Sequence, residues 1–289
     1  MKKWLLLLLS ITSFACSYGQ REGGLYHLNK EYNEDPFDDY SYSFFGANYL
    51  SNNVYLGRHD SATLPYYTPY VGYQMHNGFY GKASASYSPI KKFGRFDVFA
   101  LELGYDRSFG KRILTGVSVE KYFYYKKSPG IKAAIKDNIS LYCLYKNGKI
   151  EPQVMFAINQ GKTNDYVVGL SIDHNIRLRD NTLNIYPTAA FYYGSQHYFD
   201  DYYLNKLNRR DNSNITREVV NGAGEYKPLN IEFNARTTFR TPAWLFTLIP
   251  TYSLPMSAAT ISLPNKVITE RLKSSFYVSL DICYRHERK

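Results

Sequence analysis

The chain has 289 residues, and its 35 lysines and arginines against 25 aspartates and glutamates give a formal net charge of +10. A basic balance is compatible with nucleic-acid binding, but no basic helix is predicted, so nucleic acid is disfavoured as a partner. Beyond the N-terminal segment no apolar run approaches the roughly 20 residues of a membrane helix, which excludes an α-helical membrane bundle. Aromatic residues make up 17% and include 30 tyrosines, a residue that favours membrane interfaces.

The N-terminus has the composition of a secretory signal peptide. Lys2 and Lys3 precede the apolar run "WLLLLLSITSFA", which is too short to span a membrane as a helix. Small residues before Gln20 favour cleavage after Gly19. We therefore expect a signal peptide over 1–19 and a polar, acidic periplasmic leader over 20–40.

The three cysteines leave two questions open. Cys16 could be a lipidated residue, but Ser13 stands where a lipoprotein signal usually has leucine, which favours ordinary cleavage. Cys143 and Cys283 could form one bridge. Because both lie within apolar faces, we interpret them as free thiols, either buried or facing lipid.

From residue 41 onward the chain repeats a long segment of alternating apolar and polar residues followed by a turn. Such alternation predicts β-strands, and no segment keeps the 3.6-residue apolar stripe of a helix. In the strand 228–240, for example, every second residue from Leu229 to Phe239 belongs to an apolar face that is predicted to contact lipid. The twelve predicted strands cover 42–51, 66–76, 79–88, 96–107, 112–124, 133–145, 150–159, 166–176, 183–196, 228–240, 244–254 and 274–285.

The connections between these strands are sorted by length. Tight turns follow strands two, four, six and ten, with a modest one after strand eight, and Asn77-Gly78 is a strong hairpin signal. Long connections follow strands one, nine and eleven. If the strands run up and down in turn, the tight turns share one rim and the long loops the other. This predicts an all-β fold, a closed transmembrane antiparallel up-and-down β-barrel of about 12 strands over 41–285, with a basic tail at 286–289.

The polar face of each strand would then face the barrel lumen. Twelve strands lie between the eight whose interior is filled by side chains and the sixteen that leave an aqueous channel, so a narrow or occluded lumen is expected. We expect a paired charge network there rather than a substrate-selective lining, and the mixed signs argue against strong ion selectivity. The predicted lumen-lining residues are Lys82, Glu102, Glu120, Glu151, Asp173, Glu232, Arg236, Arg240, Asp281 and Arg285.

Aromatic residues concentrate at the strand ends, as in the two interfacial girdles of a membrane barrel. The wider set of candidates includes Phe44, Tyr66, Tyr122 and Tyr192. The main predicted girdle residues are Phe79, Tyr105, Phe239, Trp244, Tyr252, Phe276 and Tyr284.

These features resemble Gram-negative outer-membrane β-barrel proteins, over nearly the whole mature chain. In such proteins the last strand often ends in an aromatic residue that the barrel-assembly machinery reads, and here "VSLDICY" ends at Tyr284, although "RHERK" follows it. The stretches "SNNVYLGR" and "PYYTPYVGY" look like an uncharacterised barrel family. The resemblance implies an outer-membrane location and contact with membrane lipids and lipopolysaccharide, for which the candidates are Lys91, Lys92, Arg95, Lys126 and Lys127.

The function that we favour is a narrow pore or transport-type barrel. One alternative is a lipid-modifying hydrolase, for which two loop groups would have to converge in space. Another is a structural or adhesive barrel that acts through its long loop at 197–226. No zinc-ligand spacing, cofactor site or complete catalytic constellation is predicted. The loop groups weighed for catalysis are His59, Asp60 and Ser61, and His197 with Asp200 and Asp201.

Overall fold

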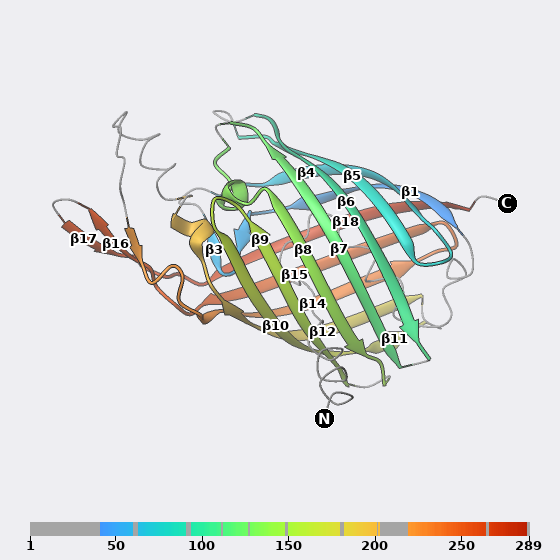
Figure 1. Ribbon diagram of the computed structural model, residues 1–289. Helices are drawn as coiled ribbons and strands as arrows, with labels where there is room; N and C mark the ends of the chain where they lie inside the picture. The colour runs from blue at the N-terminus through green and yellow to red at the C-terminus, as the bar shows by residue number, and fades with distance from the viewer. Residues whose placement is uncertain are drawn as a thin grey trace, which may run out of the picture.

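A single closed β-barrel dominates the computed structural model (Figure 1). The structure describes residues 41–59, 63–90, 94–110, 112–126, 128–147, 150–179, 182–200, 202, 219–263 and 266–287. All barrel pairings are antiparallel, β1 joins β18 and β10 joins β12, so the ring has no open edge. Its strands are β1 (Tyr42–Leu50), β4 (Tyr66–Gln74), β5 (Phe79–Ser88), β6 (Arg95–Phe109), β7 (Ile113–Tyr124), β8 (Asp137–Tyr145), β9 (Ile150–Gln160), β10 (Asn164–His174), β12 (Leu183–Gly194), β14 (Lys227–Arg240), β15 (Trp244–Pro255) and β18 (Ser275–Glu287).

The remaining elements are short. β2 (Val54–Tyr55) and β3 (Arg58–His59) form a small hairpin, and β11 (Ile176–Leu178) extends the pairing of β12. A separate three-stranded sheet projects beyond one end of the barrel (Figure 1). Among the described residues no helix is long and apolar enough to cross a membrane. The other short elements are the 3₁₀ helix η1 (Ile131–Ala134), a helical turn at 197–200, and the sheet strands β13 (Val219–Asn221), β16 (Thr260–Leu263) and β17 (Lys266–Thr269).

The predicted strands coincide with the twelve barrel strands to within a few residues. The largest deviation is at β8, which was predicted to begin at residue 133 and begins at Asp137. The chain before it forms η1, although no helix was predicted. Ile131 and Ile135 are buried there, so this segment folds over the end of the barrel instead of extending the strand.

Connection lengths separate the two ends of the barrel, as predicted. Gly78 adopts a φ of +101° in the hairpin between β4 and β5, a conformation that favours glycine. We call the end with mostly short connections the turn end and the other the loop end; the connections at 161–163 and 89–94 are the short ones at the loop end. Turn-end connections are 75–78, 110–112, 146–149, 175–182 and 241–243, and loop-end connections are 51–65, 89–94, 125–136, 161–163, 195–226 and 256–274.

Side chains alternate along each strand between a buried inner face and an exposed, apolar outer face. Leu103 is 70% exposed, Phe276 64% and Ile172 55%. Removing apolar surface from water is worth roughly 25 cal/mol per Å², so a continuous apolar exterior would be unfavourable in water and is matched to hydrocarbon. A closed barrel also leaves no unpaired strand edge in lipid. The fold is therefore a transmembrane β-barrel.

The apolar face predicted for 228–240 is confirmed except at its first residue. Ile231 is partly exposed, Phe233 and Phe239 are exposed, and Glu232 and Arg236 are buried on the inner face. Leu229, predicted to face lipid, is fully buried. The register of β14 with β12 shifts between Tyr192 and Tyr193, and such an irregularity reverses the face on which a neighbouring residue lies.

Candidate functional site: the barrel interior

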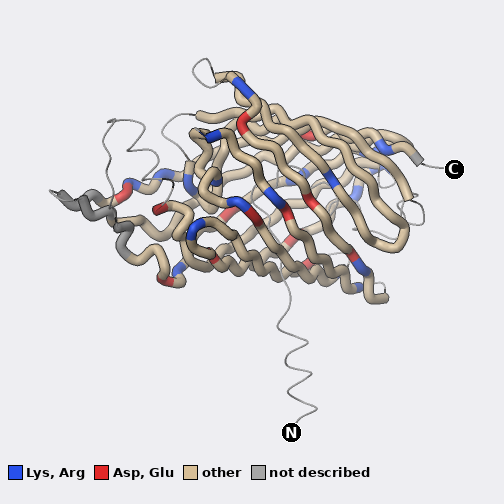
Figure 2. The backbone as a smooth tube through the Cα atoms, turned by 45° about the horizontal axis from the view of Figure 1, so that its top comes forward, with Lys and Arg blue, Asp and Glu red and all other residues tan. Residues whose placement is uncertain are grey.

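The ten predicted lumen residues all occupy inner-face positions of barrel strands. Nine are buried, and Arg240, at the turn end of β14, is partly exposed. The positions of acidic and basic residues along the strands are visible in Figure 2. The interior is therefore polar and charged at many positions while the exterior is apolar. This polarity is the reverse of a water-soluble β-sandwich.

Two ion pairs join members of the predicted set. Lys82 Nζ lies 2.5 Å from Glu102 Oε2, across the pairing of β5 with β6. Arg236 lies 3.8 Å from Asp173, and its guanidinium stacks over the ring of Tyr186 at 4.2 Å. Pairing of this kind is what permits charges to stay buried, so part of the expected network is present.

Tyrosine hydroxyl groups donate to six of the inner carboxylates. Tyr277 donates to Glu232, which also accepts hydrogen bonds from Asn230 at 2.8 Å and Ser253 at 3.2 Å. Such hydrogen bonds satisfy a buried carboxylate and leave its charge in place. The tyrosine–carboxylate pairs are Tyr66–Asp97 at 2.6 Å, Tyr70–Asp281 at 2.9 Å, Tyr80–Glu102 at 3.0 Å, Tyr122–Glu120 at 2.6 Å, Tyr142–Asp106 at 2.9 Å and Tyr277–Glu232 at 3.4 Å.

This lining was missed from the sequence, because the tyrosine excess was assigned to the girdles. Tyr66, Tyr122 and Tyr192 are 1%, 7% and 2% exposed, and Phe44 is 1% exposed, so their assignment to the outer surface was wrong. Each is followed or preceded by a second aromatic residue, and only one of two neighbours in a strand can face outward. Strand alternation was the signal that could have separated them.

Inner glycines provide the space for these tyrosine rings. Gly104 lies opposite Tyr80, and Gly116 opposite Tyr142, in the strand register. A Cβ on Gly104 would come within 2.4 Å of the Tyr80 ring, and one on Gly116 within 2.1 Å of the Tyr142 ring. The rings therefore lie against the bare backbone of the neighbouring strand.

The loop end of the interior is closed by the β2–β3 hairpin, Val54–His59, which we call the plug. Leu56 and Gly57 form its tip with positive φ, as a two-residue hairpin turn requires. A Cβ on Gly57 would lie 2.8 Å from Pro255 Cα and from Asn230 Oδ1, so the tip rests on β14 and β15. The tip of the plug thus lies on the wall two to three strands away from β1, where its own connection begins.

Polar contacts hold the plug in place from several directions. Asn159 of β9 donates to the Tyr55 hydroxyl at 2.8 Å, and the Tyr55 ring packs edge-on against Tyr198 at 5.1 Å. Arg58 pairs with Glu270 at 3.0 Å and stacks on Phe199 at 4.6 Å. Burial alone would lower the pKa of Arg58, but Tyr198 and Glu270 raise it above its ordinary value. Arg58 is therefore a permanent cation within the loop-end packing.

The girdle candidates lie on the outer surface near the strand ends. Phe79, Phe239, Trp244, Tyr252 and Phe276 are exposed, and Tyr105 and Tyr284 are partly exposed. Near the turn end several stack as neighbours, with ring centroids 4.6 Å apart for Phe79–Tyr105 and 4.9 Å for Trp244–Tyr284. Both free cysteines also follow the alternation, since Cys283 is buried on the inner face and Cys143 is partly exposed on the outer face.

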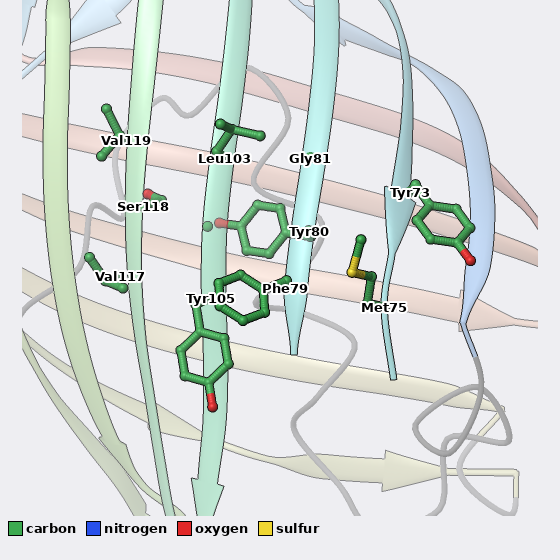
Figure 3. Close-up of a pocket in the computed structure, with 11 residues that line it drawn as sticks. Tyr73, Met75, Phe79, Tyr80, Gly81, Leu103, Tyr105, Val117, Ser118 and Val119 are labelled. Atoms are coloured by element: carbon green, nitrogen blue, oxygen red, sulfur yellow. The ribbon is translucent and has the colours of Figure 1, made fainter. Parts of the chain in front are cut away.

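An outer groove of about 580 Å³ lies on the same surface, where β5 to β7 approach the turn end (Figure 3). It is open above Gly81, which has no side chain to fill it, and Phe79, Leu103 and Val119 border it. Because this surface is apolar and faces outward, the groove is a hollow in the lipid-facing wall and does not belong to the interior.

The loop groups considered for catalysis do not assemble a nucleophile and its base among the described residues. Asp60, Ser61 and Asp201 lie outside those residues. His197 Nδ1 lies 3.0 Å from Asp165, and the Ser195 hydroxyl donates to that same carboxylate at 2.8 Å. Asp165 also accepts from the backbone N–H groups of His197 and Tyr198. It therefore caps the helical turn at 197–200, and the serine is bound to the acid rather than to the imidazole.

No described group of three or more His, Cys, Asp and Glu side chains is arranged to hold a metal ion. Of the basic clusters considered for lipopolysaccharide, Lys91, Lys92 and Lys127 lie outside the described residues. Arg95 stacks over the Tyr125 ring at 4.0 Å and lies 3.8 Å from Asp97 at the loop end.

No protein-family model matches the chain, and no curated protein matches it. Among solved structures, it is similar to a KdgM porin in complex with disordered oligogalacturonate, with 9% identity, a TM-score of 0.42, and coverage of 84% of this chain and 98% of that one. The NanC porin gives 7% identity, a TM-score of 0.43 and coverage of 84% and 98%. LpxR from Salmonella typhimurium gives 8% identity, a TM-score of 0.41, and coverage of 83% of this chain and 99% of that one.

Proposed function

We propose that this barrel is a narrow channel or transport barrel of the outer membrane, which moves polar solutes through its charged interior. The observation that carries the proposal is a group of inner-face residues that stay partly exposed within the closed ring. We call this group the inner strip, and its members are Asn48, Asn234, Ile249 and Ser279.

The inner strip lies on four neighbouring strands, β1, β18, β15 and β14. Asn48 of β1 donates to the Ser279 hydroxyl of β18 at 2.8 Å, and Ser279 lies opposite Ile249 of β15. On β4 to β10 the other large inner-face side chains are buried away from the strand ends. An accessible polar surface on one wall only supports a narrow passage rather than a wide aqueous pore.

The plug adds a closed state to this passage. It fills the loop end with Tyr55 and Leu56, both buried, and Arg58 fastens it to Glu270. Segments that gate a channel must leave their packed position for the channel to conduct. We therefore expect brief openings from a mainly closed channel.

Reconstitution in planar lipid bilayers tests the proposal. Purified, folded protein should give small stepwise conductances, whereas the same preparation denatured by heat should give none. Folding is checked by the slower migration on gels that a barrel shows after boiling. Correctly folded protein that never produces conductance steps, with the plug intact or replaced by a Gly-Ser linker, would contradict the channel function.

A second candidate function, adhesion through the long loops, is favoured by the sheet β13–β16–β17 that projects beyond the barrel. Deleting 197–226 would test it by surface binding of whole cells. Unchanged binding after deletion would count against adhesion and leave the channel proposal intact.

We also retain as proposals the contacts inferred from sequence. Membrane lipids would cover the apolar exterior, lipopolysaccharide phosphates would meet basic residues such as Arg95 and Lys126 at the loop end, and the barrel-assembly machinery would read the last strand at Tyr284. Exposed apolar side chains on β18, such as Phe276 and Leu280, support the first of these.

A further inference from the structure

Buried acidic side chains outnumber buried basic ones, although the whole chain is basic. The full sequence carries +10, yet among the described residues nine carboxylates and only five cationic side chains are buried. The buried cations are Arg58, Lys82, Lys132, Arg236 and Arg285, and the buried carboxylates are Asp97, Glu102, Asp106, Glu120, Glu151, Asp165, Asp173, Glu232 and Asp281.

The carboxylates are held largely by neutral donors. Six of the nine accept a hydrogen bond from a tyrosine hydroxyl. A neutral donor satisfies the oxygen and leaves the negative charge for other cations to feel. In a narrow interior with low-dielectric walls, such charges raise the local concentration of cations and exclude anions.

Two of the five buried cations come from loop-end segments and not from the barrel wall. Arg58 belongs to the plug, and Lys132 belongs to η1. They lie at the loop-end half of the interior, close to Glu120, Glu270 and the rings of the loop-end packing.

The surroundings of Lys132 are those of a cation-binding site. Its ammonium lies 4.9 Å from the centre of the Tyr122 ring and 5.3 Å from that of Tyr55. It also donates to the Tyr122 hydroxyl at 3.4 Å, and that hydroxyl donates to Glu120 at 2.6 Å. Aromatic faces beside a carboxylate are the surroundings that proteins use to hold ammonium groups.

Arg58 has equivalent surroundings, with the Phe199 ring at 4.6 Å and the Glu270 carboxylate at 3.0 Å. We propose that the barrel interior selects cations over anions, and that Arg58 and Lys132 act as resident counter-cations in the positions that a permeating cation would occupy. This inference rests on the proposed channel function and gives it a class of substrate.

Reversal potentials in planar bilayers test the selectivity. With a tenfold KCl gradient, the current through the wild-type channel should change sign at a voltage shifted toward the equilibrium potential of potassium. The permeability ratio for K⁺ over Cl⁻ should be at least about threefold. Lys132→Gln should raise that ratio, while Glu120→Gln and Asp106→Asn should each lower it. Lys121→Gln is the matched control, because Lys121 lies on the outer face, is half exposed and pairs with Asp137.

A reversal potential at zero or on the chloride side, or the same change for Lys121→Gln as for Lys132→Gln, would overturn the proposal. A barrel that never conducts refutes the channel function. The preference of the interior for cations over anions can still be measured in that case. Tyrosine fluorescence of folded protein in detergent, each ion's effect being divided by its effect on free tyrosine, should then be quenched more by Cs⁺ than by I⁻, and Glu120→Gln should reduce the difference. Equal quenching by the two ions would overturn the inference independently of conductance.

Discussion

The wall from β4 to β10 and the wall made by β14, β15, β18 and β1 enclose the same interior, but their inner faces differ. On the first wall, large side chains such as Tyr80 and Tyr142 lie across glycines of the neighbouring strands, and the inner face is buried. On the second wall, the inner strip remains partly exposed. The comparison shows that the choice of inner side chains, more than the number of strands, determines where the inner face stays accessible.

The physical reason is the space available to each ring. A tyrosine that lies over a glycine places its hydroxyl beside the next carboxylate along the wall, as Tyr142 does with Asp106 at 2.9 Å. Asparagine and serine, in contrast, are too short to reach the opposite wall. The large inner side chains of the first wall therefore pack against that wall, whereas the short side chains of the second wall leave part of the inner face exposed.

The largest effect should come from removing one of the glycine positions. Gly116→Val would place carbon atoms where the Tyr142 ring and the Asp106 carboxylate now lie, since a Cβ would be 2.1 and 2.2 Å from them. We expect the ring to be displaced and the unfolding free energy to fall by about 1–3 kcal/mol, as in overpacked cores. The midpoint of urea unfolding in detergent measures it.

The matched control is Gly81→Val on the outer face of β5. Its Cβ would lie 3.2 Å from the flexible end of the Leu103 side chain and 3.9 Å from the Glu102 carbonyl oxygen. Its unfolding midpoint should stay close to that of the wild-type protein. Equal losses at the two glycines would show that the inner rings do not depend on the bare backbone beneath them.

The second prediction concerns the plug. Glu270→Gln removes the charge that pairs with Arg58, which is 2% exposed while the Glu270 side chain is 18% exposed. Because a buried cation loses its partner, the closed state should weaken by about 1.4 kcal/mol, which is a tenfold rise in open probability. Single-channel recordings measure this probability. Asp137→Asn, in an exposed pair with Lys121, should leave it unchanged, and an equal rise there would argue against the plug as the gate.

The third prediction tests the accessible wall directly. Asn48→Trp would add a large ring to the inner strip, whereas Ala47→Trp would add the same ring to the lipid-facing side of the same strand. We expect unit conductance to fall by about threefold in the first variant, since a narrow pore is sensitive to its diameter. Conductance should be unchanged in the second. Equal conductances would show that solutes do not pass along the inner strip.

The barrel itself was predictable from the sequence because three independent patterns agree. Alternation placed Glu102 and Asp281 inside and Leu103 and Phe276 outside, turn residues such as Gly78 marked the hairpins, and loop lengths sorted the two ends. These are local properties of a strand and its neighbours. They required no knowledge of how distant segments meet.

The plug could not be predicted in the same way, and the tyrosine lining was missed although strand alternation indicated it. "VYLGRH" contains a hairpin turn, but its position inside the barrel depends on contacts with Asn159, Pro255 and Glu270, which are distant in sequence. Adjacent aromatic pairs such as Tyr66–Tyr67 were assigned to one surface when only Tyr67 lies there. The abundance of tyrosine suggested that both residues of such a pair lie at the membrane interface. Strand alternation allows only one of the two to face outward.

The smallest expected effect concerns a single hydroxyl on the boundary between the two walls. Tyr70 of β4 donates to Asp281 of β18 across the inner face of β1. Tyr70→Phe keeps the ring over Gly46 and removes only this hydrogen bond, so the loss of unfolding free energy should be about 1 kcal/mol. A buried carboxylate that loses a hydrogen-bond donor holds its negative charge less well, so the K⁺ over Cl⁻ ratio should fall slightly. Tyr252→Phe on the outer face supplies the control for both readouts. A loss of stability without any change in the permeability ratio would mean that Asp281 supports the wall but does not act on the passage beside it.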